Sequence, residues 1–402
     1  MGIQSLRQFY NIMFKSQKIR KAMVQDYLDK GIVSETDIKE LKEILTSLEA
    51  IPQTQNQLIL TLNHKQILID ISYESNELKK DIFFFTHTEK EFYNFLSDLH
   101  PSFKKEVNKC AKLLEGRTWK NFMTDRDGTI NNYCGRYISS IQSAYNAVFL
   151  TRFAQSCAEN SLILTSAPLQ NKGLVDISTA PENAFIYAGS KGREFINTKG
   201  RVIQFPIKPE KQKILNILNR RLTELAKNPD YEIFSLIGSG LQFKFGQTTI
   251  ARQDIYESIP EPESLNFLSV ITDIVKDIDP DENELHIEDT GKDIEIILTI
   301  KEKGSKEFTD FDKGHGIDFI DKSLKLDMES GPNLICGDTK SDIAMLITSL
   351  QKTENTCSIF VTQDDELKKL LKRETSHICI VSEPDILVSI LNSTAVKRKG
   401  TL

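Results

Sequence analysis

Residues 121–129 read NFMTDRDGT, a short apolar strand that runs directly into an aspartate-rich turn. From average residue frequencies, the pattern D-x-D-G-T arises by chance in roughly one in a hundred chains of this length. Asp125 and Asp127 can converge on one site if the chain turns after the first of them, and Gly128 permits that turn. The alternative is an Asx turn followed by a helix cap, which Asp-Gly-Thr sequences often make. The position at the end of a strand favours a functional site.

A second acidic turn follows another apolar strand late in the chain. The segment Gly337–Asp342 reads GDTKSD, comes directly after the apolar run Asn333–Cys336 and opens a helical pattern. Asp338 and Asp342 are four residues apart, so Asp342 can support a ligand shell that Asp338 enters directly. Both residues also fit a simple helix cap. Together with Asp125, however, three carboxylates at adjacent strand ends form a hard oxygen site suited to Mg²⁺.

A hydroxyl and a lysine complete the pattern. Thr165 follows the apolar strand Leu162–Leu164, and Lys313 stands in the sequence DKGHG at residues 312–316. A cation offsets charge on the oxygens of a phosphoryl group, and a hydroxyl fixes their orientation. Taken singly, Thr165 fits an ordinary strand end and Lys313 a surface lysine. In the order DxDGT, Thr, Lys, GDxxxD they predict a phosphoryl-transfer site.

Buried strands alternate with helices from Trp119 onward. This alternation predicts a parallel sheet covered on both faces, with ligands bound outside the carboxyl ends of the strands. The expected fold class is therefore α/β, with a Rossmann-like parallel sheet at its core. Further strands and the main helices are expected at Leu334–Cys336, Ser358–Val361, Ile378–Val381, Ser139–Ala154 and Ser341–Leu350.

Residues 201–304 interrupt the alternation and are expected to form an inserted α+β cap over the reactive edge of the sheet. Two helices with apolar stripes, Glu210–Lys227 and Glu263–Ile278, alternate with short strands. The strands are expected at Val202–Phe205, Ile233–Ile237, Leu241–Phe245, Glu284–Glu288 and Asp293–Ile300. The core domain then comprises residues 118–200 and 305–402.

Residues 1–117 are expected to form an N-terminal helical domain. Apolar residues recur at helical spacing from Leu6 and again from Ile38. The apolar stretch Leu58–Ile71 fits a helix or a strand, and we expect a helix. A further helix, interrupted by a proline, is expected over Glu89–Leu114. This region groups no catalytic residue types, so we expect it to hold or bind something, either a protein partner or a second copy of the chain.

The composition argues against several other classes. The chain has 402 residues and a formal charge of 51 − 57 = −6, with 39% apolar and 27% charged residues. This is a globular balance without the basic footprint of nucleic-acid binding. No apolar run approaches the roughly 20 residues of a membrane span, and the start lacks a signal-peptide core. Six scattered cysteines with no C-x-x-C pair argue against a disulfide framework, so we expect a reduced, cytoplasmic protein.

The order of these motifs resembles that of the haloacid-dehalogenase-like phosphatases, from Trp119 to about Leu391. More narrowly, the chain is similar to the trehalose-6-phosphate phosphatase family, and its N-terminal part resembles the helical domain of the animal and parasitic-worm branch. The narrower resemblance rests on AGSKG at residues 188–192, GK with a following glutamate at residues 291–295, and DKG at residues 312–314. The sequence departs from the pattern of this family at three places. Gly189-Ser190 replaces the usual His-Gly, Glu295 comes one residue early, and GDTKSD at residues 337–342 replaces GDDxTD.

The resemblance implies a Mg²⁺-dependent phosphatase that hydrolyses trehalose 6-phosphate through an aspartyl phosphate. Asp125 would attack phosphorus, and Asp127 would protonate the leaving oxygen and then deprotonate water. Thr165 and Lys313 would bind the transferring group. Four aspartates are implied in metal binding: Asp125, Asp127, Asp338 and Asp342. Asp127 would bind the ion through its backbone carbonyl, and Asp342 would orient the other ligands.

Sugar recognition should come from the cap and its borders, because hydroxyl-rich ligands need paired hydrogen bonds from charged side chains. The candidates, each of which also fits a solvated surface position, are Lys191, Lys244, Arg252, His286 and Glu295. Two other functions stay open, namely a phosphatase for another sugar phosphate and a scaffold whose N-terminal helices engage a partner. Arg126 and His315 have no assigned role.

Overall fold

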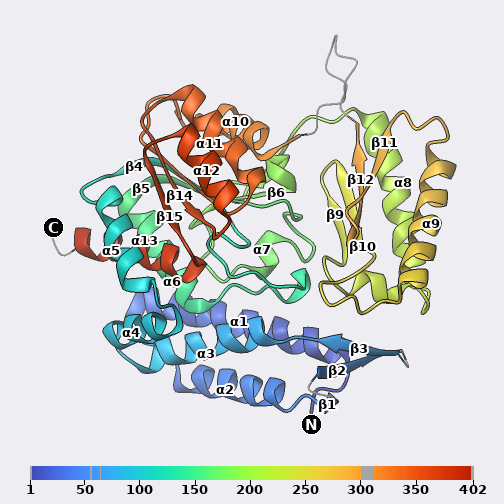
Figure 1. Cartoon of the computed structure of the whole chain (residues 1–402), viewed down its shortest axis with the longest axis horizontal. Coiled ribbons are helices and arrows are strands. Elements are labelled where there is room, and N and C mark those ends of the chain that lie inside the picture. Colours follow the sequence, from blue (N-terminus) through green and yellow to red (C-terminus); the bar gives the residue numbers. More distant parts are fainter. Residues whose placement is uncertain (1, 55–56, 64, 300–310, 400–402) are drawn as a thin grey trace.

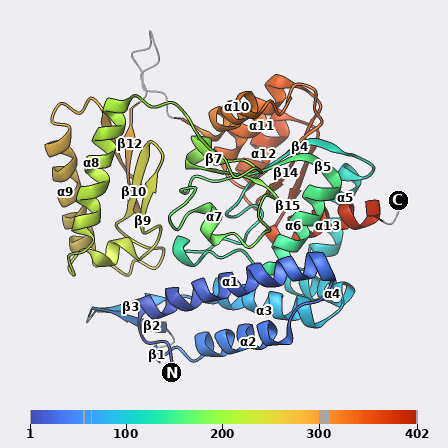
Figure 2. The ribbon, with the colours of Figure 1, turned by 180° about the vertical axis from the view of Figure 1, so that it is seen from behind.

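The computed structural model describes residues 2–54, 57–63, 65–299 and 311–399, which form three parts (Figure 1). A central α/β core carries the large sheet, and a smaller α+β unit stands beside it. An N-terminal, mostly helical part lies along one side of both, as the view from behind also shows (Figure 2). The α/β class with an inserted unit and N-terminal helices is confirmed. The expected cap boundary at residue 304 lies outside the described residues.

The core sheet has eight strands in the order β15-β14-β13-β4-β5-β6-β7-β8. Neighbours are parallel from β15 to β6, whereas β6, β7 and β8 pair antiparallel. Successive residues point to opposite faces, so Phe122 joins the apolar core on one face and Met123 the core on the other. The strands are β4 (Trp119–Asp125), β5 (Ala158–Leu164), β6 (Ile186–Gly189), β7 (Glu194–Ile196), β8 (Val202–Gln204), β13 (Asn333–Gly337), β14 (Thr356–Val361) and β15 (Ile378–Val381).

Helices cover both faces of this sheet. One face packs against α6 and α13, and the other packs against α10, α11 and α12 (Figure 1). The helices of the core are α6 (Ala144–Cys157), α7 (Leu174–Ile177), α10 (Lys313–Leu324), α11 (Lys340–Lys352), α12 (Asp365–Glu374) and α13 (Pro384–Lys399), with short 3₁₀ turns η1 (Tyr137–Ser139) and η2 (Ser190–Gly192). No helix in the described part of the chain is both long and apolar enough to cross a membrane.

The inserted unit, which we call the cap, is an antiparallel sheet in the order β11-β12-β10-β9, with α8 and α9 on one face (Figure 1). Its elements are α8 (Pro209–Leu225), η3 (Glu232–Ser235), β9 (Leu241–Lys244), β10 (Gln247–Ala251), α9 (Glu261–Ile278), β11 (Leu285–Asp289) and β12 (Asp293–Leu298). The expectation of a strand at Ile233–Ile237 is wrong, because η3 is a 3₁₀ turn whose apolar side chains are buried. A short apolar run does not distinguish the two structures. The expected strand at Val202–Phe205 forms β8, which pairs with β7 in the core sheet and not with the cap.

The N-terminal part contains α1 (Leu6–Lys30), α2 (Glu35–Glu49), α3 (Ser72–Thr86), α4 (Glu89–Leu99) and α5 (Phe103–Leu114), with strands β1 (Gln53–Thr54), β2 (Gln57–Leu62) and β3 (Lys65–Ile69). The interrupted helix expected over Glu89–Leu114 is confirmed as α4 and α5. The helix expected at Leu58–Ile71 is wrong, since β2 and β3 form an antiparallel pair there. Leu60 and Leu62 are buried on alternate positions, which is the period of a strand.

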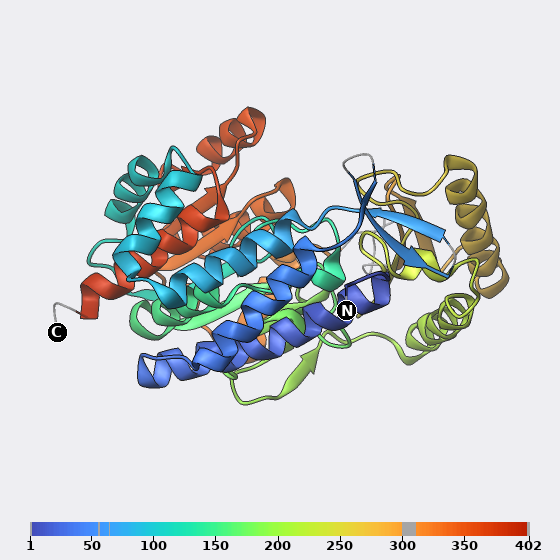
Figure 3. The same ribbon diagram turned by 90° about the horizontal axis from the view of Figure 1, so that it is seen from below.

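The N-terminal part spans the core and the cap. Seen from below, α1 runs along the core and reaches toward the cap (Figure 3). At its cap end, Arg7 pairs with Glu232 and the Tyr10 hydroxyl donates to the carbonyl of Leu236. The hairpin adds an ion pair of 2.6 Å between Lys65 and Glu263. The cap is therefore held by contacts with the N-terminal part as well as by its two chain connections to the core.

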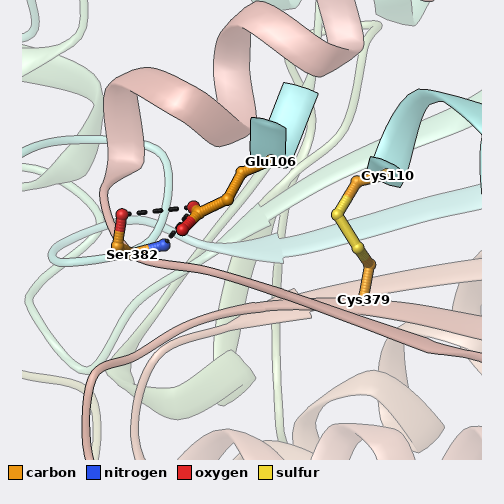
Figure 4. The surroundings of a disulfide bond; sticks show 4 residues. All are labelled: Glu106, Cys110, Cys379 and Ser382. Carbon is orange, nitrogen blue, oxygen red and sulfur yellow. Dashed lines mark hydrogen bonds between the residues drawn. A yellow bond between two sulfur atoms is a disulfide. The ribbon is translucent and has the colours of Figure 1, made fainter. Parts of the chain in front are cut away.

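A disulfide joins α5 to the core sheet. Figure 4 shows Cys110 of α5 bonded to Cys379 of β15, with both side chains buried. One turn earlier on α5, Glu106 accepts hydrogen bonds from the backbone N–H and the hydroxyl of Ser382, at 2.7 and 3.1 Å. This pair corrects the expectation of a reduced chain. A separation of 269 positions leaves no local sequence signal for the bond.

A buried group of charges centres on Asp385, at the start of α13. Its carboxylate accepts hydrogen bonds from Lys80 at 2.9 and 3.0 Å and from Tyr145 at 2.5 Å, and His100 Nε2 lies 2.8 Å away. Burial alone would raise the pKa of Asp385, but Lys80 and the hydrogen bonds hold it well below its usual range. These contacts join α3 and α4 of the N-terminal part to the core through one carboxylate.

We expect Asp385→Asn to lower the free energy of unfolding by about 3 kcal/mol at pH 7, because buried Lys80 then keeps only Glu77 of its two carboxylate partners. The folded-state pKa lies below the unfolded value near 4, so the ionised carboxylate stabilises the fold above about pH 4. That stabilisation is lost as the pH falls further. Urea unfolding at several pH values measures both effects.

The matched control is Asp365→Asn, whose side chain is exposed at the start of α12. We expect that change to alter the unfolding free energy by less than about 0.5 kcal/mol. The difference between wild type and Asp385→Asn should shrink between pH 5 and pH 3. A difference that stays constant over this range would contradict the role assigned to the carboxylate.

Candidate active site

Gly128 allows two acidic turns to meet. Its backbone has a φ of +84°, and a Cβ at this position would lie 2.2 Å from Asp338 Oδ2, so only glycine fits. The next residue joins the two turns directly. The Thr129 hydroxyl donates to Asp338 Oδ1 at 2.8 Å and lies 3.3 Å from Asp125 Oδ2. The ends of β4 and β13, neighbours in the sheet, thereby bring both aspartates to one place.

Lys313 is bound between two carboxylates. It is the first residue of α10, and its Nζ donates to Asp125 Oδ1 and to Asp342 Oδ1, each at 2.5 Å. The other oxygen of Asp342 accepts from the backbone N–H groups of Asp338 and Thr339, at 3.1 and 2.9 Å. Asp342 therefore holds both the lysine and the turn that carries Asp338.

The carboxylates of this group carry more negative charge than Lys313 balances. Burial, opposed by Lys313, raises the pKa of Asp125 to about 7. Burial together with the carboxylates of Asp125 and Asp342 raises the pKa of Asp338 to about 9. Burial would also raise the pKa of Asp342, but Lys313 and the two backbone N–H groups hold it below its usual value.

The donor set fits a hard divalent cation. One carboxylate oxygen from each of Asp125, Asp338 and Asp342 lies within 4.8 Å of the others. Oxygen ligands at this density suit Mg²⁺, which needs only one or two protein carboxylates and keeps several waters. A divalent charge would also balance the excess that raises the pKa values of Asp125 and Asp338. Asp342 Oδ2 accepts from two backbone N–H groups of the turn that carries Asp338, which fits a role in orienting that turn around the ion.

Asp127 and Thr165 lie beside this group of carboxylates and Lys313, in the lining of one cavity. The Asp127 side chain is one quarter exposed, and its Oδ1 accepts from Arg126 and, at 3.1 Å, from the hydroxyl of Ser140. Thr165 follows β5 and is held by the carbonyl of Ala188, to which its N–H donates at 2.9 Å. Both residues line the same cavity as Asp125 and Lys313.

The cavity lies between the core and the cap and has a volume of about 330 Å³. That is within the roughly 300–1,000 Å³ of small-molecule sites. Two of the expected sugar-binding residues, Lys244 and Glu295, line it from the cap, with their charged groups 3.9 Å apart. Burial lowers the pKa of Lys244, an effect that Glu295 opposes.

The other three candidates lie outside the cavity lining. Arg252 is bound to Asp289 at 2.7 Å and to Ser264 of α9, so its side chain faces the helices of the cap. His286 is exposed on β11, the edge strand, which contributes nothing to the described lining. Lys191 lies in the η2 turn, where its N–H donates to the carbonyl of Thr165 at 2.9 Å. The expectation that Arg252 and His286 face the site is therefore corrected.

Several lining residues were missed from the sequence. On the cap they include Ser239, Gln242, Thr249, Gln253, Asp254, Lys292 and Asp293. A period-2 signal was available for part of this set, because Gln242 precedes Lys244 by two residues and Asp293 precedes Glu295 by two. Thr249 pairs with Gln242 and with Glu295 across the sheet, so these residues share a face. In the core, Thr129 was quoted within its motif without the bridging role that its hydroxyl has.

Acidic residues on two neighbouring strand ends, with a cap inserted between them in the chain, are the arrangement of the haloacid-dehalogenase-like phosphatases. A family model described as "Trehalose-6-phosphate phosphatase, C-terminal" matches residues 122–387. A second, described as "Trehalose-6-phosphate phosphatase N-terminal helical bundle domain", matches residues 5–101. The chain belongs to the trehalose-6-phosphate phosphatase family.

Individual relatives agree with this membership. The chain is 31% identical to the Caenorhabditis elegans "Alpha,alpha-trehalose-phosphate synthase (UDP-forming) 2", over 98% of this chain and 34% of that protein. It is 29% identical to the Brugia malayi "Trehalose-phosphatase", over 96% of this chain and 85% of that protein. The chain thus spans about a third of the length of the synthase relatives. A solved "trehalose-6-phosphate phosphatase related protein" aligns with 70% of this chain and 100% of its own, at 12% identity and a TM-score of 0.47.

We expect Gly128→Ala to lower phosphatase activity and Mg²⁺ affinity by at least about 100-fold, because its Cβ would displace Asp338. The matched control is Gly116→Ala, at a φ of +70° with nothing within 4 Å of the added Cβ. The control should lose about 1–2 kcal/mol of stability from backbone strain and keep its activity. Phosphate release and thermal unfolding of both variants measure this, and equal losses of activity would contradict the steric argument.

Mg²⁺ should bind more tightly as the pH rises from 6 to 8. The raised pKa values of Asp125 and Asp338, about 7 and about 9, mean that protons occupy these carboxylates at pH 6 and must leave when the ion binds. We expect the affinity to rise by about tenfold or more over this range. Titration calorimetry in two buffers of different ionisation enthalpy measures both the affinity and the protons released. An affinity that does not change with pH would rule out direct ligation by these residues.

Proposed function

We propose that the chain is a Mg²⁺-dependent phosphatase that hydrolyses trehalose 6-phosphate to trehalose and phosphate. The observation that carries this proposal is the group of buried Asp125, half-buried Asp338 and buried Lys313, which faces a cavity lined by the core and the cap. A nucleophilic carboxylate, a metal site and a fixed cation are the parts that hydrolysis of a phosphate ester needs. The family membership of the chain supports the same reaction.

The reaction that we propose has two steps. A carboxylate oxygen of Asp125 forms a bond to phosphorus while the bond from phosphorus to the sugar oxygen breaks, and Asp127 gives that oxygen a proton. A water molecule then attacks phosphorus as Asp127 takes its proton, and phosphate leaves with the Asp125 carboxylate restored. Each step replaces part of a very slow direct hydrolysis by an easier reaction. Lys313 and Thr165, which line the same cavity, would bind the oxygens of the phosphoryl group.

Mg²⁺ would be held by Asp125, Asp338 and the carbonyl of Asp127, with Asp342 orienting these ligands. When bound, the ion offsets the negative charge of the phosphoryl oxygens and of the carboxylates. Lys313 does part of this work within the chain itself, because its ammonium group lies between Asp125 and Asp342. Its pKa, which burial alone would lower, is raised above the usual value by these carboxylates, so Lys313 stays charged throughout.

The sugar would bind between the phosphate site and the cap sheet. Lys244 and Glu295 offer a cation and a carboxylate 3.9 Å apart, which suits paired hydrogen bonds to neighbouring hydroxyls. Gln242, Thr249 and Asp293 lie on the same lining and add uncharged and charged partners. This polar wall supports a sugar rather than an apolar alcohol as the leaving group.

Phosphate release from trehalose 6-phosphate with Mg²⁺ is the direct test, alongside glucose 6-phosphate, sucrose 6-phosphate and p-nitrophenyl phosphate. We expect the trehalose ester to have the highest kcat/KM, and Asp125→Asn to lower turnover of every substrate by at least about 10³-fold. A preference for another ester would keep the mechanism and change the sugar. Full activity of Asp125→Asn would contradict the mechanism and leave the scaffold function.

Lys244→Met should raise KM for trehalose 6-phosphate by about 10- to 100-fold, since it removes charged hydrogen bonds to the sugar. Turnover of p-nitrophenyl phosphate, which has no sugar, should change by less than about twofold. His286→Ala is the control from the same sheet, because His286 is exposed outside the cavity. Equal effects of the two changes would contradict the assignment of the sugar site.

Two further expectations stay predictions. One is a cytoplasmic location. The other is that the N-terminal helices engage a protein partner or a second copy of the chain. Exposed α2 residues such as Lys39 and Glu43 are available for such contacts.

A further inference from the structure

Arg126, the central residue of the DRDGT motif, is buried beside the active site. Its side chain is 3% exposed, and the guanidinium group donates to Asp127 Oδ1 and to both the hydroxyl and the carbonyl of Ser140. The Ser140 hydroxyl in turn donates to the same Asp127 oxygen at 3.1 Å. The described contacts of this carboxylate therefore all fall on Oδ1, while the side chain as a whole lines the cavity.

The hydrogen bonds continue from Ser140 into the N-terminal part. Asn131 Nδ2 lies 3.4 Å from the Ser140 hydroxyl and donates to the hydroxyl of Tyr73 at 2.9 Å. The Tyr73 hydroxyl donates to the carbonyl of Ile141 at 2.7 Å. Tyr73 lies in the first turn of α3, so one hydroxyl from the N-terminal part contacts both ends of the loop from residue 131 to residue 141.

Glu74, the next residue of α3, accepts hydrogen bonds from the middle of the same loop. Glu74 is 1% exposed, and its Oε1 accepts from the Ser139 hydroxyl at 2.6 Å and from Arg136 at 3.2 Å. The loop itself contains little regular structure, only the short 3₁₀ turn η1. Side-chain contacts with α3 therefore help to set the shape of the loop, in addition to the backbone hydrogen bonds of its turns.

These contacts bear on how precisely Asp127 is placed. An acid or base must lie within hydrogen-bond reach of the atom it serves, and a misplacement of about 1 Å can lower the rate roughly 100-fold. The guanidinium group of Arg126 is a planar fork that contacts Asp127 and Ser140 at once, which a single flexible ammonium group does less well. Arg126 and Ser140 thereby hold Oδ1 of Asp127, while the Asp127 side chain lines the cavity.

We propose that Arg126 is a positioning residue that, with Ser140, orients the Asp127 carboxylate toward the substrate, and that Tyr73 of the N-terminal part anchors this arrangement. The inference rests on the proposed function, in which Asp127 serves as acid and then as base. It gives the N-terminal helices a role in positioning a residue of the site, separate from any partner they bind.

The two steps of the proposed reaction predict how the kinetics should change when Asp127 is misplaced. p-Nitrophenolate is a good leaving group that needs little protonation, so the first step on its ester depends only weakly on Asp127. The second step still needs Asp127 to take a proton from water. A misplaced Asp127 should therefore allow a burst of p-nitrophenolate of about one per active site, followed by slow turnover. Both steps on trehalose 6-phosphate should be slow, because the sugar oxygen needs the proton.

The variants are Arg126→Met, Arg126→Lys, Ser140→Ala and Tyr73→Phe, and the matched control is Tyr93→Phe. Tyr93 of α4 also bonds the core through its hydroxyl, with the Ser389 carbonyl at 3.2 Å and the Ser393 hydroxyl at 3.1 Å, but it takes no part in the chain to Asp127. We expect kcat on trehalose 6-phosphate to fall about 10- to 100-fold in Arg126→Met and about 3- to 10-fold in Tyr73→Phe. KM should stay within about twofold, and Arg126→Lys should restore part of kcat.

Stopped-flow p-nitrophenolate release, Mg²⁺ titration and thermal unfolding complete the test. A burst followed by slow turnover, with unchanged Mg²⁺ affinity, supports the proposal. Wild-type turnover in Arg126→Met and Tyr73→Phe overturns it, as does a loss of the burst together with Mg²⁺ affinity, which would show general damage to the site. If Arg126→Met does not fold, the same measurements on Ser140→Ala and Tyr73→Phe test the proposal. Failure of the proposed function is separate, since it appears as absence of phosphate release in the wild type.

Discussion

The candidate active site depends on one buried cation shared by two carboxylates. Lys313 joins Asp125, which ends β4, to Asp342, which lies in α11. In the sequence, the whole cap lies between Asp125 and Lys313. Without the ammonium group, the carboxylates of Asp125, Asp338 and Asp342 would repel one another in a buried place. The first turn of α10 must therefore lie at the sheet edge, with the side chain of Lys313 between the end of β4 and α11.

The N-terminal part gives this arrangement a third support. Its helices pack on α6 of the core, its hairpin and α1 contact the cap, and α5 is bonded to β15. A further hydrogen bond of 2.8 Å joins the Tyr256 hydroxyl of the cap to Asp70. The N-terminal part thus contacts both the core and the cap, whose residues line the cavity, so the spacing of the two walls depends on all three parts.

The core and the acidic residues were predictable because their signals are local. An apolar run followed by D-x-D-G-T or G-D-x-x-x-D places carboxylates at a strand end, and parallel neighbours bring those ends together. The errors fell where a short apolar run admits two structures. Leu58–Ile71 became a hairpin and Ile233–Ile237 a 3₁₀ turn, because burial against distant elements outweighed local preference. His286 and Arg252 were misplaced because the face and the edge of a strand depend on its neighbours in the sheet.

The sequence by itself determined the alternation of strands and helices in the core, the two acidic turns and the glycine that lets them meet. These are consequences of spacing within a few residues, which any fold must respect. Only the tertiary structure decided which side chains surround the site: the contacts of Arg126 with Ser140, the approach of Tyr73 from α3, the cap residues that line the cavity, and the bond from Cys110 to Cys379. Such contacts join positions far apart in the chain, so they exist only once the parts have packed together.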